Sequence, residues 1–285
     1  MQDRRRISSG RARVAFLVGC AALACGLPRS ASAQYNAPPL SGLAVGERYH
    51  VELGGTIWNP MLMGTISSEQ FKIVGSTIDL VNDLGFEQTR LKELRLVLRP
   101  ARKHRVKVQY TPISYTATTN FTRVIKFNGI NFPAAIPIAT AFDWKVLRFG
   151  YEYDMVYRDR GFFGVFVEGR YTEFLGSLKS ASPLFVGSEF TEAKAPLPAL
   201  GVSGRAYVAP NVALNLEVSG FNVPGTIKKG YAANYYDWDI HGTVNVTNNF
   251  GIQVGWRRMT TFLEVDNDKA DFRFQGMWFG AAARF

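Results

Sequence analysis

Pairs of a histidine and a carboxylate are the residues of this sequence with the clearest potential for chemistry. His50 is followed two residues later by Glu52, and Asp239 precedes His241 by two residues. Side chains two residues apart on a strand lie on the same face, where a carboxylate can orient an imidazole. The third histidine, His104, lies in a basic turn, where solvent is its expected environment. No nucleophile motif accompanies either pair, so the sequence favours polar packing over catalysis.

Metal and cofactor chemistry has little support. Both cysteines, Cys20 and Cys25, lie in the first 33 residues, which we expect to be removed, so the remaining 252 residues contain no thiolate ligand, disulfide or catalytic cysteine. The stretch 266–271 is rich in carboxylate and amide oxygens but lacks the glycine and the distant glutamate of a hand-type calcium loop. We therefore expect no metal and no cofactor.

The first 33 residues have the composition of an export signal. Arginines near the start precede an apolar stretch over 14–27, and small residues follow at 30–33. This pattern predicts a Sec signal peptide cleaved after Ala33. A lipoprotein box ending at Cys20 and a twin-arginine signal at Arg4 and Arg5 are the alternatives. Without this leader, 27 basic and 22 acidic residues remain, which argues against a nucleic-acid binder.

Apolar and polar residues alternate with a period of two through most of the remaining chain. Leu94, Leu96 and Leu98, for example, alternate with charged residues. Such alternation is typical of strands whose two faces meet different surroundings. The pattern predicts an all-β fold with about ten strands, at 47–58, 90–99, 105–127, 138–157, 162–178, 192–208, 212–225, 233–247, 250–265 and 271–285.

The connections and the aromatic residues favour a barrel over a soluble sandwich. Short turns rich in turn-forming residues, at 100–104, 158–161, 209–211 and 247–249, alternate with longer segments at 59–89, 128–138, 179–191, 223–234 and 266–270. Many aromatic residues fall near predicted strand ends, where the interfacial girdles of a membrane barrel belong. They are Tyr49, Trp58, Trp144, Tyr157, Phe162, Tyr171, Tyr207, Tyr235, Trp238, Phe250 and Trp256.

The sequence thus predicts a transmembrane antiparallel up-and-down β-barrel, with ten strands as the preferred number. Eight or twelve strands also fit, because 71–80 reads equally as a strand or as part of a folded loop. The domain organisation that follows is a leader over 1–33, a periplasmic segment over 34–46 and one barrel domain over 47–285.

The last residues of the chain strengthen this prediction. Gly280, Ala283 and Phe285 fall on positions that, in outer-membrane β-barrel proteins, form a C-terminal signal read by the assembly machinery. The chain therefore resembles the small bacterial outer-membrane barrels of about 8–12 strands. It departs from their pattern at Trp278, where a polar residue is expected, and at Ala283, which is small for its place. The resemblance matches no single functional branch.

In a barrel with an apolar exterior, the charged face of each strand points into the lumen. A barrel of about ten strands is narrow enough for such side chains to fill it as paired charges. The expected lumenal network consists of Arg48, His50, Glu52, Glu93, Arg95, Lys107, Arg148, Glu152, Asp154, Glu168, Arg170, Arg205, Glu217, Asp239, His241 and Arg257.

The function expected from these features is that of an integral outer-membrane barrel, structural or narrowly pore-forming, without a catalytic centre. A lipid-modifying hydrolase or acyltransferase and a surface adhesin are the alternatives. The expected partners are outer-membrane lipid and lipopolysaccharide, the barrel-assembly machinery and periplasmic chaperones, but not nucleic acid. Basic residues expected near the outer rim suit glycolipid phosphates; they are Arg123, Lys126, Lys145, Lys179, Lys228 and Lys229.

Overall fold

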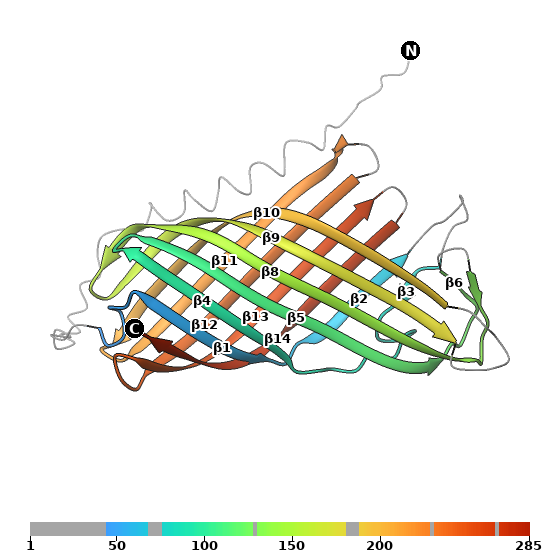
Figure 1. Ribbon diagram of the computed structural model, residues 1–285, viewed down its shortest axis with the longest axis horizontal. Coiled ribbons are helices and arrows are strands. Elements are labelled where there is room, and N and C mark those ends of the chain that lie inside the picture. Colours follow the sequence, from blue (N-terminus) through green and yellow to red (C-terminus); the bar gives the residue numbers. More distant parts are fainter. Residues whose placement is uncertain (1–43, 68–75, 128–129, 181–187, 229–230, 266–267) are drawn as a thin grey trace, which may run out of the picture. The chain divides into compact units, whose positions relative to one another are not determined.

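The alternating pattern forms ten long strands in the computed structural model, which describes residues 44–67, 76–127, 130–180, 188–228, 231–265 and 268–285 (Figure 1). Every neighbouring pair is antiparallel, and β1 pairs with β14 to close the ring. The predicted ten-stranded barrel is confirmed. Its strands are β1 (Val51–Trp58), β4 (Leu91–Ala101), β5 (His104–Asn120), β8 (Pro137–Arg158), β9 (Gly161–Ser180), β10 (Ser188–Ala209), β11 (Val212–Lys228), β12 (Tyr231–Asn245), β13 (Phe250–Val265) and β14 (Asp268–Arg284).

The two ends of the barrel differ in their connections. Four tight connections join β4 to β5, β8 to β9, β10 to β11 and β12 to β13, and we call this the short-turn end. At the opposite, long-loop end, β2 (Met61–Ser67) continues the line of β1 along β14, and β3 (Ile78–Asp79) pairs with β2. A small hairpin of β6 (Ile125–Phe127) and β7 (Ile130–Phe132) lies between β5 and β8.

The predictions of long loops at 223–234 and 266–270 are wrong. β11 runs to Lys228 and β12 begins at Tyr231, while β13 runs to Val265 and β14 begins at Asp268. Segments 223–234 and 266–270 are therefore mostly strand.

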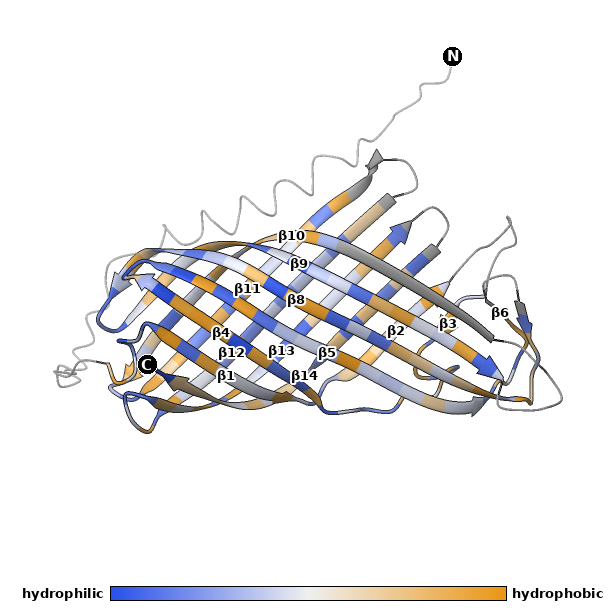
Figure 2. Cartoon of the chain, in the orientation of Figure 1, coloured by the Kyte–Doolittle hydropathy of each residue, from blue (hydrophilic) through white to orange (hydrophobic). Residues whose placement is uncertain are grey.

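The outer surface carries an apolar belt in the half nearest the short-turn end. On β8, the outward residues Leu147, Phe149, Tyr151 and Tyr153 are all exposed, and Figure 2 shows the alternation of hydropathy along these strands. On β5, the outward residues toward the long-loop end are instead Ser114, Thr116, Thr118 and Asn120, which are also exposed. The exterior thus changes from apolar to polar along the barrel axis.

The interior changes in the opposite sense. Inside the belt, the lumen holds charged side chains, which form the charged layer described below. Toward the long-loop end, it holds an apolar core that we call the aromatic layer. The buried residues of this layer are Trp58, Leu62, Ile78, Leu80, Leu84, Phe86, Leu91, Ile113, Tyr115, Phe121, Ile125, Phe132, Ile138, Phe142, Trp144, Val146, Leu178, Tyr235, Met259, Phe272, Phe274 and Trp278.

The aromatic layer corrects part of the girdle prediction. Trp58, Trp144 and Tyr235 are only 2%, 4% and 2% exposed and pack inside, whereas Tyr171 and Phe250 are exposed on the outer surface. The error arises because nearness to a strand end does not fix the face on which a side chain lies; that depends on strand parity and register. The chain over 78–86 also belongs to this layer, so part of the predicted loop 59–89 folds into the barrel.

Pairing of β10 with β11 stops partway along the two strands. The last paired residues toward the long-loop end are Leu200 and Gly220, although both strands continue, and their outer ends diverge (Figure 1). Pro196 and Pro198 lie on β10 just beyond this point. Proline has no N–H to donate and is confined to edge strands within sheets, so the sequence itself explains the split in the wall.

Among the described residues there is no helix long and apolar enough to cross a membrane. The predicted signal peptide, its cleavage after Ala33 and most of the periplasmic segment 34–46 lie outside the described residues, as does part of 71–80.

Candidate functional site in the barrel lumen

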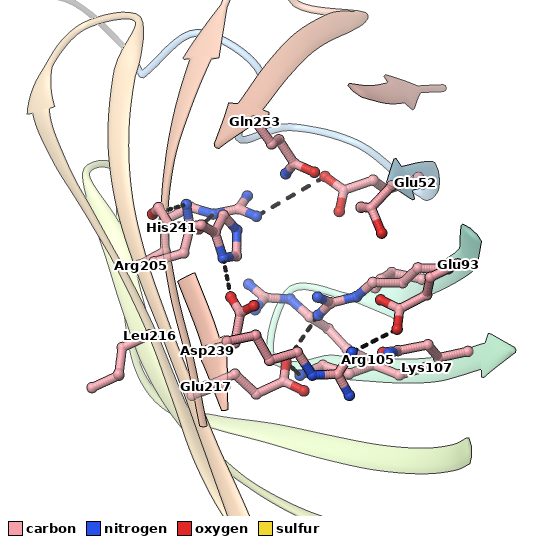
Figure 3. Close-up of a pocket in the computed structure, with 18 of the residues that line it drawn as sticks. Glu52, Glu93, Arg105, Lys107, Arg205, Leu216, Glu217, Asp239, His241 and Gln253 are labelled. Carbon is pink, nitrogen blue, oxygen red and sulfur yellow. Dashed lines mark hydrogen bonds and ion pairs between the residues drawn. The ribbon is translucent and has the colours of Figure 1, made fainter. Parts of the chain in front are cut away.

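The charged layer surrounds a small cavity of about 60 Å³ in the lumen (Figure 3). A buried water needs roughly 10–15 Å³ of such volume, so the cavity has room for about five waters. In Figure 3, Glu217, Asp239, His241 and Arg205 point from the wall into this space, while Leu216 points out of the barrel. Strand alternation thus delivers polar groups to the lumen and apolar ones to the exterior.

Arg148 and Asp237 are the central pair of the layer. The Arg148 guanidinium lies 2.9 Å from Glu168, 3.1 Å from Glu217 and 3.1 Å from Asp237. Asp237 also accepts hydrogen bonds from Arg257, at 2.7 and 2.9 Å, and from the Tyr235 hydroxyl, at 2.9 Å. Because both groups are buried, each depends on its partners to remain charged at tolerable cost.

The pairs continue without a break to the short-turn end. Glu217 is 2.9 Å from Arg95 and 2.8 Å from Lys107, and Lys107 also pairs with Glu152. Ion pairs of the described residues join eight acidic and nine basic side chains into one network, to which Asp239 and His241 add a separate pair. The network consists of Glu47, Glu52, Glu93, Arg95, Arg99, Arg105, Lys107, Arg148, Glu152, Asp154, Glu168, Arg170, Arg205, Glu217, Asp237, Arg257 and Arg284.

Residues 44–49 close the lumen at the short-turn end. Glu47 is 2% exposed and lies 3.2 Å from Arg205 and 3.5 Å from Arg99. Just before it, Gly46 has φ +79°, and a Cβ there would stand 2.6 Å from the Arg284 guanidinium. Glycine is required for this close passage, because other residues seldom adopt such a φ and would collide.

Of the sixteen residues predicted for the lumen, all but two join the charged layer. The exceptions are Arg48 and His50, which are exposed at the short-turn end. The prediction fails there because β1 begins only at Val51, so the alternation of β1 does not extend to the residues before it. His50 instead lies 3.3 Å, through Nδ1, from the backbone oxygen of Arg99.

Sequence reasoning missed several members of the network. Asp237, Arg105 and Arg284 are at most 4% exposed and each holds two or more partners. Parity could have found two of them, since Asp237 shares a strand face with Asp239 and Arg105 shares one with Lys107. Glu47 gave no such signal, because it reaches the lumen from a segment that is not a strand.

Of the two histidine–carboxylate pairs considered from the sequence, one forms in the structure and the other does not. Asp239 and His241 form a hydrogen-bonded pair at 2.5 Å, and Asp239 also accepts from the Trp278 indole at 2.6 Å. His50 and Glu52 separate, since His50 is exposed and Glu52 pairs inside with Arg284 at 2.5 Å. The Asp239–His241 pair has the orientation of a general base and its carboxylate, but it is enclosed in the charged layer.

The predicted assembly signal occupies the end of β14. Gly280 pairs with Thr56 on β1 and Ala283 pairs with Leu53, so both help to close the barrel. Phe285 is 70% exposed, and its backbone oxygen accepts from the N–H groups of His50 and Val51. The pairing shows where these residues lie, and their recognition by assembly factors stays a prediction.

Two further predictions concern the long-loop end. Residues 266–267 of the calcium-like stretch lie outside the described chain, and the described residues contain no cluster of three metal-ligating side chains. Among the predicted rim residues, Arg123 is tied to Asp83 at 2.7 Å, and Lys145 lies 3.9 Å from Glu173. The side chains of Lys228 and Lys229 are outside the description.

Comparison with known proteins identifies the fold but no close relative. No protein-family model matches the chain, and no curated protein matches it in sequence. The solved structure of the outer membrane protease OmpT from Escherichia coli aligns with a TM-score of 0.53 at 10% identity, covering 86% of this chain and 100% of that one.

Two other solved structures are less similar. Ail, the attachment invasion locus protein of Yersinia pestis, aligns with a TM-score of 0.35 at 12% identity, covering 83% of this chain and 99% of its own. The toluene transporter TodX of Pseudomonas putida gives 0.36 at 9% identity, covering 88% and 94%. At 10% identity, the likeness to the OmpT structure concerns architecture alone. This chain has the β-barrel fold of bacterial outer-membrane proteins.

Proposed function

We propose that the chain is an integral outer-membrane barrel with a closed lumen, a structural component of the envelope and not a solute pore. The observation that carries the proposal is the filling of the lumen by two successive layers. The charged layer leaves only about 60 Å³ of space, and the aromatic layer lies beyond it along the same axis. A solute crossing the barrel would have to displace both.

The outer surface supports membrane insertion. Exposed apolar side chains on β8, β9 and β11 include Phe149, Val165 and Leu214, which are 59%, 40% and 51% exposed. In water such a belt would be an aggregation surface, whereas outer-membrane barrels present an apolar band of this kind to lipid. The short-turn end then faces the periplasm, as in barrels of this class.

The histidine positions favour a structural role over an enzymatic one. His50 and His104 lie at the short-turn end, and His241 is enclosed in the charged layer. The long-loop end, where an external substrate would arrive, thus has no histidine to act as a general base. We therefore rank a lipid-modifying or proteolytic activity below the structural role.

Surface recognition is a second candidate, favoured by the packing of the loops. The Arg123 guanidinium is 2.7 Å from Asp83 and 2.6 Å from the backbone oxygen of Thr77, so two loops are bound together over the aromatic layer. A preorganised loop surface loses little entropy on binding a partner. Lipopolysaccharide at the rim is the partner we propose for exposed basic residues such as Lys145.

Conductance in a planar lipid bilayer tests the proposal. The protein should be refolded and its barrel verified by the difference in gel mobility between unheated and boiled samples. We expect a silent bilayer under applied voltage at high salt. Reproducible stepwise openings from heat-modifiable protein would overturn the closed lumen and make the chain a narrow pore.

A further inference from the structure

A groove at the short-turn end has the shape and charge of a ligand site. Its volume is about 520 Å³, and the residues lining it include Arg48, His50, Arg99, Arg102, Tyr157 and Asp159. This volume lies in the range of small-molecule sites. The groove is separate from the lumenal cavity, and it lies at the end of the barrel marked by C in Figure 1.

Basic side chains outnumber acidic ones among the residues that line the groove. Arg48 and Arg102 are exposed, and neither forms an ion pair within the described part of the chain. Arg99 forms the floor, with its guanidinium 4.4 Å from the centre of the Tyr157 ring. Asp159 is the one acidic side chain among those lining the groove. Planar guanidinium groups free of carboxylate partners are suited to bind phosphate oxygens through paired hydrogen bonds.

Tyrosines add neutral character to this basic site. Burial raises the pKa of the Tyr49 phenol, so this residue stays protonated and adds no negative charge. Tyr49 and Tyr157 both line the groove, beside the exposed Phe285. A ligand with an anionic head and an apolar part fits such a combination.

The basic character is restricted to one side of the short-turn end. In and beside the β4–β5 and β8–β9 turns, Arg102, Lys103 and Arg158 are exposed basic residues and Asp159 is an exposed acidic one. The other two turns, over 209–212 and 245–250, contain no charged residue. Basic residues that served only solubility would be spread evenly around the rim. Here they are concentrated in one sector of the rim.

The same sector adjoins the apolar belt. Lys103 Nζ lies 5.9 Å from the centre of the Tyr153 ring, and His104 Nδ1 lies 2.5 Å from the Tyr151 hydroxyl. Both tyrosines are exposed on the outer face of β8. Basic groups beside outward-facing aromatic rings are typical of the boundary between acyl chains and headgroups.

We propose that this groove binds the phosphate of an anionic glycerophospholipid headgroup in the leaflet that surrounds the short-turn end. Arg48 and Arg102 hold the phosphate, and Tyr157 packs against the glycerol. The Asp159 carboxylate repels the anionic phosphate and so lowers the affinity of the groove for the lipid headgroup. The inference rests on the proposed insertion into the membrane.

The test compares retention of phosphatidylglycerol and of phosphatidylcholine with identical acyl chains by the full-length refolded protein, using native mass spectrometry in mixed micelles. Each basic side chain at an anionic lipid surface contributes about 1 kcal/mol, which corresponds to roughly fivefold in affinity. We expect Arg48→Gln with Arg102→Gln to lower phosphatidylglycerol retention about 25-fold, and Asp159→Asn to raise it severalfold.

A matched control removes the same charge from elsewhere. Arg90→Gln with Lys92→Gln neutralises two exposed basic residues near the long-loop end of β4 and should leave retention within twofold of the wild type. Arg102→Gln alone, in an exposed turn, serves if the double variant does not fold. The gel-mobility shift reports folding of the barrel separately, so a loss of lipid binding is distinguishable from a failure to fold, and flotation of the protein with lipid vesicles reports membrane insertion.

Three results would overturn the inference. Equal retention of both lipids by the wild type would remove the anion preference. An equal loss in the control variant would show that net charge, and not the groove, governs binding. Displacement of phosphatidylglycerol by inorganic phosphate at similar concentration would identify a free phosphate-bearing solute as the ligand.

Discussion

The two halves of the barrel bury opposite kinds of side chain in the lumen and expose opposite kinds on the outer surface. Near the short-turn end the wall is apolar outside and charged inside, with Phe149 exposed and its neighbour Arg148 buried. Toward the long-loop end the wall is polar outside and aromatic inside, with Thr116 exposed and Tyr115 buried. The strands are continuous, and inward and outward positions keep alternating along them. The inversion therefore comes from the types of residue that occupy each face.

The surroundings explain the inversion. A wall that faces lipid must place its apolar side chains outward, and the polar ones that remain have to pair with one another in the lumen. A wall that faces water is free to build an ordinary apolar core. The closure of the lumen therefore depends on ion pairs in one half and on aromatic packing in the other.

Removing a central carboxylate of the charged layer should have the largest effect. Asp237→Asn deprives Arg148, Arg170 and Arg257 of a shared partner, and breaking a buried ion pair costs about 3–5 kcal/mol. We expect a fall of this size in the free energy of unfolding, measured by urea titration in lipid vesicles. The exposed Asp159→Asn is the control, and equal stability of both variants would contradict a stabilising role for the Asp237 ion pairs.

Truncating the aromatic layer should cost somewhat less. Phe272 lies 5.3 Å from Phe142 and 6.0 Å from Phe174 between ring centroids. We expect Phe272→Ala to destabilise the protein by about 3 kcal/mol, at the lower end for a buried phenylalanine because the outer half can partly relax.

The site of damage should also differ between the two layers. In Phe272→Ala, limited proteolysis is expected to cut the long-loop end while the membrane half stays protected. Protection of both halves equal to that of the wild type would show that the aromatic layer is not a separate stabilising unit.

A matched pair of lysine substitutions tests the boundary of the apolar belt. Phe149→Lys places a charge on the predicted lipid face and should cost about 2–3 kcal/mol. Thr116→Lys places the same charge on the outer face of the projecting half, where we expect a change within about 0.5 kcal/mol. Equal effects in vesicle unfolding would mean that the belt is misplaced.

The smallest effect is expected at the split between β10 and β11. Replacing Pro196 and Pro198 by threonine restores two N–H groups, and the change in stability should be below about 1 kcal/mol because new bonds offset the added freedom of the unfolded chain. Hydrogen exchange should show greater protection over 221–223 if β11 then pairs. Unchanged exchange would mean that the prolines do not maintain the split.

The sequence by itself determined the barrel and most of its charged interior. Alternation with period two identified nine of the ten strands to within four residues at each end, because a strand between lipid and lumen cannot tolerate a slip of one residue. The predicted strand 105–127 was too long, since β5 ends at Asn120 and 125–127 belongs to the hairpin strand β6. The same parity assigned Arg148, Glu168 and Arg170 to one face. Parity also places Asp237 on the inner face of its strand, although Asp237 was not among the residues predicted for the lumen.

Only the tertiary structure decided how that interior is closed. Glu47 enters the lumen from a segment outside the strands, and Leu80 and Leu84 enter it from the chain between β2 and β4. These residues are far apart in sequence from their contacts and lie in irregular backbone. A periodic pattern in the sequence therefore cannot predict such contacts. The inward side of Trp58 and Trp144, by contrast, follows from strand parity, because they lie on the same strand faces as Glu52 and Arg148. Local pattern fixes the face of a side chain within a strand, whereas long-range packing decides what that face meets.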